Sequence, residues 1–393
     1  MLIISAVRQE KLQSGKNCIA VSFSFTTARK IIFGSGCLRD IGKEAAALGS
    51  RPLLVTGRSF LHKTGRMDEI IGYLREHGLQ VVIFDQAPPE PHLDAVEEGM
   101  AECRAYDCDL VIGIGGGSAM DVGKAIASLV RAPRPIREYF HGREVEKKGL
   151  PFVAVPTTAG SGAEATANAV LTDAEHQVKG SIRSPHMLAD VALVDPDLTL
   201  SLPPEVTAYS GMDALCQAIE SYVSRTSTPL TDALSGDAAV RLIRNLPVAY
   251  EKGDDLSART EVALGSLMGA IAFSNSRLGL VHGMAHPVGI ATGLPHGLIC
   301  GLLLPPVIRF NMQVSDAKYS VLARNAGLGS AVTLIAEVER LNELMGLNDR
   351  RPEIRTSEDL RHEVATKSLT AGSSTFNPRP ASVEDIEGIL ASL

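Results

Sequence analysis

The hydrophobic positions of the chain follow two different patterns. Between about residues 23 and 196, short apolar and β-branched runs alternate with longer stretches in which apolar residues recur at helical spacing. The short runs predict strands and the longer stretches predict amphipathic helices. The predicted strands are residues 30–33, 52–56, 80–84, 110–114, 152–156 and 191–194, and the predicted helices are residues 68–77, 93–106 and 119–128.

This alternation favours a wound, largely parallel sheet of the Rossmann-like kind, because parallel strands need crossover connections and these are usually helices. After residues 195–197 the pattern changes. Pro203 and Pro204 open a series of long helical patterns at residues 208–224, 232–245, 258–273 and 298–311. We therefore expect an N-terminal α/β domain over residues 1–198 and an all-helical domain over residues 199–393.

Composition narrows the class of protein. A chain of 393 residues is too long for one hydrophobic core, which also favours two domains. The net charge of −7 gives no electrostatic reason to bind nucleic acid or a membrane surface. The apolar run at residues 1–4 is too short for a signal-peptide core, and no run of about 18 apolar residues follows. The six scattered cysteines form no CxxC pair, so we expect reduced thiols in a soluble, cytoplasmic protein.

A glycine-rich turn is the first candidate binding site. Gly115, Gly116, Gly117 and Ser118 follow the predicted strand 110–114 and precede a predicted helix. Such a turn presents free backbone N–H groups and a positive helix end to a phosphate. The string lacks the GxGxxG spacing of the standard dinucleotide motif, so a plain tight turn is the alternative interpretation.

Two further turns follow strands of the same predicted sheet. Thr157 and Thr158 begin a hydroxyl- and glycine-rich turn after strand 152–156, where wound sheets bind ligands, although a helix cap before Glu164 explains them equally. Gly57, Arg58 and Ser59 follow strand 52–56. The absence of an acidic residue there and the presence of arginine and serine favour the 2′-phosphate of NADP, unless Arg58 is only a solvated charge.

A possible metal site lies in the helical half. Asp213 and Gln217 are four residues apart in one helical pattern and so share a face. His282 and His286 have the same spacing, and His296 follows within ten residues. One histidine in such an apolar window is usually a satisfied core residue, but three with an aspartate are costly to bury without a shared partner. Histidine and carboxylate together suit Fe²⁺, Zn²⁺ or a similar ion.

At this point the chain resembles the iron-containing, group III alcohol dehydrogenases, from about Phe23 to the C-terminus. The resemblance depends on GGGSAMD at 115–121, PTTAGSG at 156–162, GMDA at 211–214, GLVHGMAHP at 279–287, PHG at 295–297 and FNPR at 376–379. It implies a dehydroquinate synthase-like architecture, in which a nucleotide-binding α/β domain precedes a helical metal domain. Members are commonly dimers or larger oligomers.

The resemblance also implies roles for single residues. Gly115 to Ser118 would hold the pyrophosphate of NAD or NADP, and Asp121, Thr157, Thr158 and Lys179 would belong to the same cofactor site. Asp213, His282 and His296 match three metal ligands. His286 matches a histidine near the nicotinamide, a candidate proton relay whose pKa a nearby cation would depress.

The sequence departs from the family at Gln217, where a metal-binding histidine is usual. A neutral amide oxygen is a poorer ligand than imidazole for late transition metals. Gln217 could bind the ion through its oxygen, a water could replace the missing ligand, or the site could be empty; we favour a divalent ion, Fe²⁺ before Zn²⁺, held more weakly than usual. Glu90 also replaces a common asparagine near the adenine side.

The resulting hypothesis is reversible hydride transfer between NAD(P) and a small alcohol or aldehyde, with the metal as Lewis acid. Three alternatives stay open. The protein could be a metal-independent reductase similar to maleylacetate reductase, a lyase similar to dehydroquinate synthase that uses NAD transiently, or a binding protein without catalytic activity.

Overall fold

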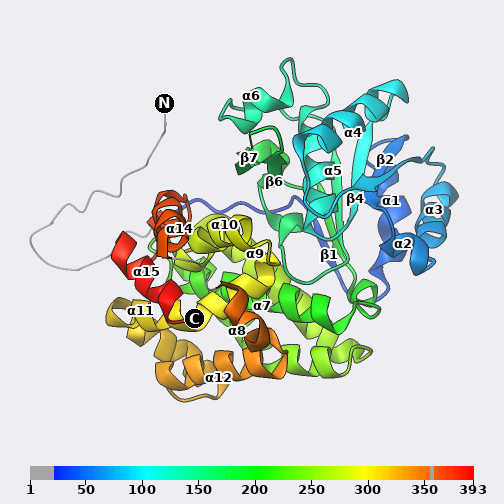
Figure 1. Ribbon diagram of the computed structural model, residues 1–393. Helices are drawn as coiled ribbons and strands as arrows, with labels where there is room; N and C mark the ends of the chain where they lie inside the picture. The colour runs from blue at the N-terminus through cyan, green and yellow to red at the C-terminus, as the bar shows by residue number, and fades with distance from the viewer. Residues whose placement is uncertain (1–21, 177, 355–357) are drawn as a thin grey trace, which may run out of the picture.

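A six-stranded parallel sheet forms the N-terminal half of the protein. The computed structural model describes residues 22–176, 178–354 and 358–393 (Figure 1), so the apolar run at residues 1–4 lies outside the described residues. The strand order is β1-β8-β5-β4-β2-β3, and every neighbouring pair is parallel. The strands are β1 (Ile31–Phe33), β2 (Pro52–Gly57), β3 (Val82–Ala87), β4 (Leu110–Gly115), β5 (Phe152–Pro156) and β8 (Val191–Val194).

Helices cover both faces of this sheet, because alternate strand residues point to opposite sides. Leu53 and Val55 of β2 pack with the core beneath α4 (Leu93–Ala105) and α5 (Gly117–Leu129). Leu54 packs on the other face with α1 (Ile41–Ala46) and α3 (Arg66–Glu76). The short helices of this half are α2 (Phe60–Lys63) and α6 (Ile136–Phe140). The predicted wound α/β sheet is therefore confirmed.

An antiparallel hairpin, β6 (Asn168–Asp173) and β7 (Val178–Arg183), was not predicted. Residues of β6 alternate between half-buried and buried, but its polar and apolar side chains form only a short pattern. Strand β3 also begins two residues later than predicted, at Val82, although the backbone N–H of Gln80 already donates to the carbonyl of Ser50.

The C-terminal half is helical. Its α-helices are α7 (Pro204–Val223), α8 (Pro229–Glu251), α9 (Leu256–Ser276), α10 (Leu280–Thr292), α11 (His296–Ala326), α12 (Ala331–Leu344), α13 (Arg351–Ile354), α14 (Glu358–Thr370) and α15 (Val383–Ala391). Short 3₁₀ helices lie at Cys37–Asp40, Ala163–Ala165, Pro185–Met187, Pro196–Thr199, Leu347–Arg350 and Ser374–Phe376. The predicted domain boundary at residue 198 falls between β8 and α7 and stays a prediction.

Helix α11 extends well beyond the predicted residues 298–311, although it contains Pro305 and Pro306. By length and composition it is the one described helix that could cross a membrane, and 61% of its most apolar window is buried inside the protein. Leu298, Leu302 and Leu303 of α11 belong to the core that α7 to α12 share. A core position explains the apolar character of this helix.

Candidate metal and cofactor site

The glycine turn between β4 and α5 needs glycine for steric reasons. Gly115 has φ of 152°, and a Cβ there would lie 2.7 Å from the Cβ of Ala119. A Cβ on Gly117 would lie 2.8 Å from the Cβ of Ser161 in the neighbouring turn. The backbone therefore bends closely enough to start α5 at once, and no acidic residue lies in the first turn of this helix. Its positive end suits a phosphate.

Hydrogen bonds hold the two predicted phosphate-binding turns together. The Thr157 N–H donates to the carbonyl of Gly115 at 2.9 Å, and a Cβ on Gly116 would contact the Thr158 side chain at 3.7 Å. The Ser118 hydroxyl donates to the carbonyl of Pro89 at 2.5 Å. The structure thus brings residues 115–118 together with Thr157 and Thr158.

Gly57, Arg58 and Ser59 lie at the same edge of the sheet. Gly57 ends β2 and the other two residues follow it; since β2 pairs directly with β4, all three lie at the carboxyl ends of the strands beside the glycine turn. Arg58 and Ser59 are exposed. Their position is compatible with the predicted contact to a cofactor.

Asp121 and Lys179 connect the turn to the β6–β7 hairpin. Asp121 accepts the Val170 N–H at 3.1 Å and lies 3.7 Å from the Lys124 ammonium, so its carboxylate anchors the hairpin to α5. Burial raises the pKa of Asp121 to about 6. Lys179 on β7 forms an ion pair with Glu90 at 2.6 Å. The cofactor roles predicted for Asp121 and Lys179 stay predictions.

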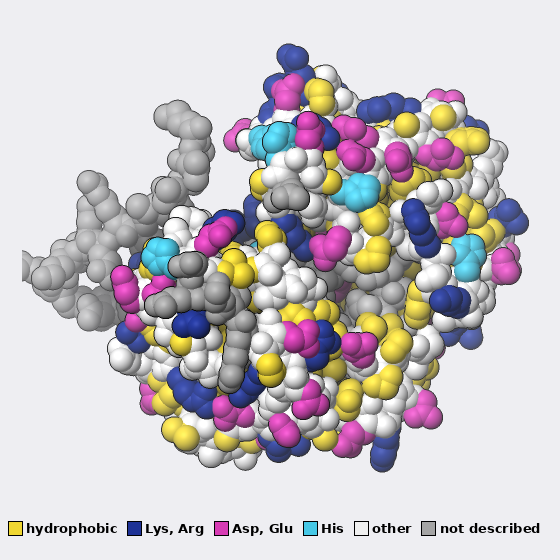
Figure 2. All heavy atoms as spheres, viewed as in Figure 1, with side chains coloured by type: hydrophobic (Ala, Val, Ile, Leu, Met, Phe, Trp, Pro, Cys, Tyr) yellow, Lys and Arg dark blue, Asp and Glu magenta, His cyan; other side chains and the backbone are white. Residues whose placement is uncertain are grey.

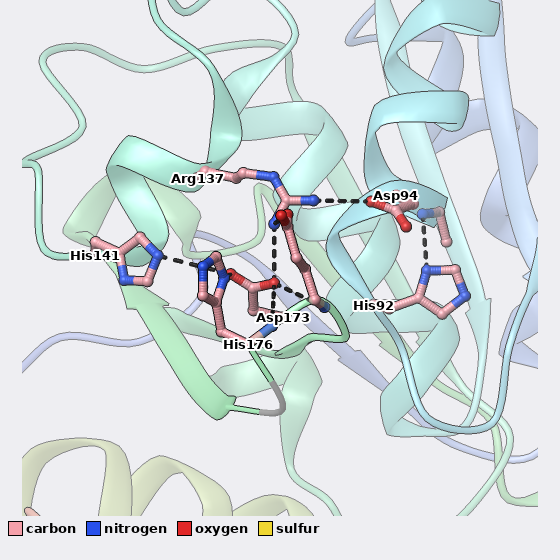
Figure 3. Close-up of polar contacts among 8 residues, drawn as sticks. His92, Asp94, Arg137, His141, Asp173 and His176 are labelled. Atoms are coloured by element: carbon pink, nitrogen blue, oxygen red, sulfur yellow. Dashed lines mark hydrogen bonds and ion pairs between the residues drawn. The ribbon is translucent and has the colours of Figure 1, made fainter.

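The turn of the hairpin is held by Asp173, which Figure 3 shows between Arg137, His176 and His141. The buried carboxylate accepts from Arg137 at 2.8 Å and from His176 Nδ1 at 2.9 Å, while His141 lies at 3.6 Å. Burial raises the pKa of Asp173, but the hydrogen bonds from His176 and Arg137 bring it down to about 2. His141, Asp173 and His176 have metal-ligand spacing, yet Arg137 already neutralises the carboxylate. We interpret this cluster as a structural anchor.

The predicted metal ligands come together from three helices. Asp213 lies on α7, His282 on α10 and His296 at the start of α11. Asp213 Oδ1 is 3.2 Å from His282 Nε2 and 3.8 Å from His296 Nε2. Helix α11 can approach α7 this closely because residue 297 is glycine: a Cβ there would lie 2.1 Å from the carbonyl of Tyr209.

Glu220 sets the orientation of His282. Its carboxylate accepts from His282 Nδ1 at 2.7 Å and from the Val281 N–H at 2.6 Å. Because Glu220 holds the Nδ1–H, Nε2 is the nitrogen of His282 that faces Asp213: it donates to this carboxylate when His282 is protonated, and its lone pair would face a bound ion, as in carboxylate–histidine–metal arrangements. Burial raises the pKa of Asp213, but the hydrogen bond with His282 and the charge of His296 lower it by more. The net pKa lies below its ordinary value, so the carboxylate is ionised.

Gln217 lies one turn after Asp213 and is buried. Its side chain hydrogen-bonds Asp213 and contributes to the lowered pKa of that carboxyl. Its Oε1 atom has no hydrogen-bond partner among the described residues. An orphaned buried acceptor is rare in a protein interior. The anionic Asp213, the two histidines and this amide oxygen fit a divalent cation.

His286 lies between the two halves of the protein. Its ring stacks on His296 with centroids 4.9 Å apart. Burial lowers the pKa of His286 to about 3, and the charges of His296 and Lys179 contribute. Lys179, on the β6–β7 hairpin of the sheet half, is thus among the charges that act on His286.

Two residues of the site were not predicted from the sequence. One is Glu220. The other is Cys300, whose Sγ atom lies 3.5 Å from His296 Nε2 and groups with Asp213, His282 and His296. Both carry a sequence signal: Cys300 is four residues after His296, and Glu220 is seven after Asp213, so each shares a helix face with a predicted ligand.

Comparisons with known proteins cover nearly the whole chain. Residues 28–196 match the family model "iron-containing alcohol dehydrogenase", and residues 207–393 match the model "Fe-containing alcohol dehydrogenase family, C-terminal". The NAD-dependent methanol dehydrogenase of Bacillus methanolicus is 34% identical over 367 residues, which are 91% of this chain and 96% of that protein. The NADPH-dependent butanol dehydrogenase of Clostridium saccharobutylicum is 32% identical over 384 residues, 93% of this chain and 96% of that protein. A crystal structure of 1,3-propanediol oxidoreductase superimposes with a TM-score of 0.91 at 34% identity, covering 95% of this chain and 100% of that one.

Proposed function

This chain belongs to the iron-containing alcohol dehydrogenase family, and on that premise we propose that it catalyses reversible hydride transfer between a nicotinamide cofactor and a small alcohol or aldehyde. The family resemblance seen in the sequence is thus confirmed. The observation that carries the proposal is the grouping of Asp213, His282 and His296 and the stacking of His286 on His296, with the charge of Lys179 from the sheet half acting on His286. Metal donors, a neutral imidazole and a nucleotide-binding half converge there.

The cofactor binds, in this proposal, with its pyrophosphate on the turn of Gly115 to Ser118 and with further contacts from Asp121, Thr157, Thr158 and Lys179. Relatives of both coenzyme types are similar to the chain, one named as NAD-dependent and one as NADPH-dependent. We favour NADP because Gly57, Arg58 and Ser59 offer a cation and a hydroxyl, and no carboxylate, beside the glycine turn.

Asp213, His282 and His296 would hold a divalent ion, Fe²⁺ or Zn²⁺, with Gln217 beside them. Lewis acidity at the substrate oxygen is the chemistry that such an ion supplies when bound. The chain's own contribution is positioning: Glu220 orients His282, and the three helices fix the donor atoms. The apolar core of the helical half surrounds Asp213 and His282 and keeps both side chains out of bulk water.

His286 is the proposed proton relay. Because burial and neighbouring cations depress its pKa to about 3, the imidazole is neutral at pH 7 and can accept a proton. It is half-buried, which allows onward transfer to solvent.

The test is oxidation of NADPH and NADH with a panel of short aldehydes, by protein stripped of metal and then given Fe²⁺, Zn²⁺, Mn²⁺ or Mg²⁺. Activity that returns with metal, with NADPH preferred, is the expected result. Equal activity after exhaustive chelation would favour a maleylacetate reductase-like enzyme instead. Cofactor binding without net turnover of any aldehyde would favour the lyase or the non-catalytic binding protein.

We also propose that the enzyme is a cytoplasmic homodimer or larger oligomer. Strand β1 is an edge of the sheet within the described residues, and an open edge can pair with a second copy. The described cysteines are free thiols, as expected in a reducing compartment. Sedimentation velocity would measure the oligomeric state, and a monomer at micromolar concentration would contradict this proposal.

A further inference from the structure

Cys300 lies inside the metal cluster rather than beside it. It is fully buried, one turn after His296 on α11, with its Sγ atom 3.5 Å from His296 Nε2. One donor atom from each of Asp213, His282, His296 and Cys300 lies within 4.8 Å of the other three. Four donors at such separations can surround one ion in a tetrahedral arrangement, and a zinc site of this kind can expand to five ligands, which leaves a position for the substrate oxygen.

The donor separations agree with that geometry. Bonds of about 2.0–2.1 Å to nitrogen and about 2.3 Å to sulfur, at tetrahedral angles, place the two donors about 3.5 Å apart. The Sγ–Nε2 distance between Cys300 and His296 is 3.5 Å. Two nitrogen or oxygen donors would be about 3.4 Å apart, and Asp213 Oδ1 lies 3.2 Å from His282 Nε2 and 3.8 Å from His296 Nε2.

The neighbouring cysteine is not placed for the same role. Cys216 Sγ lies 3.9 Å from His282 Nδ1, the nitrogen that faces Glu220. The metal-facing nitrogen of His282 is Nε2, which contacts Asp213. Cys216 therefore lies on the Nδ1 side of the His282 ring, away from the metal-facing nitrogen. Cys300, in contrast, contacts the donor nitrogen of His296.

Gln217 has a different part in the cluster. It is buried one helical turn after Asp213, and its only oxygen donor is a neutral amide oxygen without a hydrogen-bond partner among the described residues. A thiolate is a far stronger donor for borderline ions than a neutral amide oxygen. With Cys300 available, the site has a fourth ligand without Gln217.

We propose that Cys300 is the fourth metal ligand, in an Asp213–His282–His296–Cys300 site that selects Zn²⁺ over Fe²⁺ and Mg²⁺. This inference rests on the proposed function, since it assumes that a divalent ion binds here. Binding forms one metal–sulfur bond and releases the thiol proton to solvent. A thiolate with two imidazoles and one carboxylate is a donor set that suits zinc.

Cobalt substitution tests the ligand directly. The full-length apoprotein, kept reduced, is titrated with Co²⁺, and the near-ultraviolet thiolate-to-cobalt charge-transfer band is recorded. We expect one equivalent of Co²⁺ with this band in the wild type, loss of the band in Cys300→Ser, and retention in the matched control Cys216→Ser. X-ray absorption of the zinc protein should show one sulfur at about 2.3 Å, absent in Cys300→Ser.

Affinity supplies a second readout. Cys300→Ser should weaken Zn²⁺ binding on the order of 10–100-fold or more, measured by chelator competition, and should weaken Fe²⁺ binding less. Near-ultraviolet circular dichroism of each apo variant establishes that it is folded.

The outcomes separate this inference from the proposed function. Co²⁺ bound without the band, or a band that survives in Cys300→Ser, overturns the role of Cys300 and leaves metal-dependent catalysis standing. In that case, a large affinity loss in Gln217→Ala would assign the fourth position to the amide. No binding of Co²⁺ or Zn²⁺, together with full activity after chelation, overturns both proposals.

Discussion

At the scale of single residues, the site depends on buried carboxylates that have different roles. Glu220 does not face the metal cluster, but it accepts from His282 Nδ1 and from the Val281 N–H. It therefore determines which nitrogen of His282 carries the proton. Such a residue influences metal binding through the ligand that it orients.

Replacement of Glu220 by glutamine should weaken metal binding by about 10–100-fold, because the neutral amide no longer stabilises the Nδ1–H tautomer of His282. Competition with a chromophoric chelator measures this affinity. Glu205→Gln is the matched control on the exposed start of the same helix, and its affinity should equal that of the wild type. An unchanged affinity in Glu220→Gln would mean that His282 is oriented by something else.

A second carboxylate, Glu164, is buried between the two turns and α5. Burial raises its pKa to about 7, although Lys124 partly offsets the shift. The folded protein therefore binds this proton more tightly than the unfolded chain, whose carboxyl has a pKa near 4.5. Stability from this group is complete below about pH 4.5 and decreases as the pH rises toward 7.

Glu164→Gln should consequently gain stability relative to the wild type as the pH rises from 5 to 8. The expected relative gain is on the order of 1–3 kcal/mol in the free energy of unfolding, measured by urea titration at each pH. Glu98→Gln on the exposed face of α4 should give a difference that does not depend on pH. A flat difference for Glu164→Gln as well would show that this carboxyl is already ionised when folded.

At the scale of elements, close backbone approaches join the turns proposed to bind the nucleotide to the helical half. Gly160 in the turn after β5 leaves no room for a side chain, since a Cβ would lie 2.6 Å from the Cβ of Ser210 and 2.7 Å from its carbonyl oxygen on α7. Gly162 in the same turn has φ of 67°, and a Cβ would lie 2.5 Å from Ala270 on α9. The turn thus packs closely between the sheet and helices α7 and α9.

Gly160→Ala should separate the turn from α7, lowering the free energy of unfolding by about 1–3 kcal/mol and weakening nucleotide binding. Gly72→Ala in α3 is the matched control: a Cβ there meets nothing within 4 Å, and alanine should stabilise the helix by up to about 1 kcal/mol. Thermal unfolding and nucleotide titration compare the two variants. Equal behaviour would show that the turn tolerates the extra methyl group.

At the scale of the whole molecule, the sheet half and the helical half meet at the site. The proposed metal donors belong to separate helices of the helical half. Asp213, His282 and His296 lie on α7, α10 and α11, so an ion that binds all three cross-links the helical core. On the face shown in Figure 2, acidic and basic side chains are interspersed rather than gathered by sign. The polar groups of the metal cluster, by contrast, gather inside the protein, where Asp213 and His282 are buried.

Zn²⁺ should raise the unfolding temperature of the apoprotein, because an ion that binds only the folded state stabilises it by mass action. At a thousandfold excess over the dissociation constant, the gain is about 4 kcal/mol. Differential scanning calorimetry measures the shift, and Asp213→Asn should show little or none. A wild type that unfolds at the same temperature with and without Zn²⁺ would contradict a metal that bridges these helices.

Much of the fold and of the site follows from local patterns in the chain. Six strands of the main sheet and the change to helices after residue 198 are encoded by hydrophobic periodicity, which a short window of sequence reveals. The hairpin β6–β7 lacked such a signal, because its short strands mix polar and apolar residues and its turn is held by Arg137, which is distant in sequence.

The sequence by itself determined the fold class and the family, and it singled out Asp213, His282 and His296 as the predicted metal ligands, because these residues lie in short motifs with fixed spacing. Only the tertiary structure decided that Glu220 orients His282, that Asp121 anchors the hairpin, and that Cys300 joins the cluster. Helical spacing places Cys300 and Glu220 on the same helix faces as predicted ligands, but it does not fix the role of such a buried residue. Its role depends on which atoms from other helices come within bonding distance, and the packing of α7, α10 and α11 alone sets those distances.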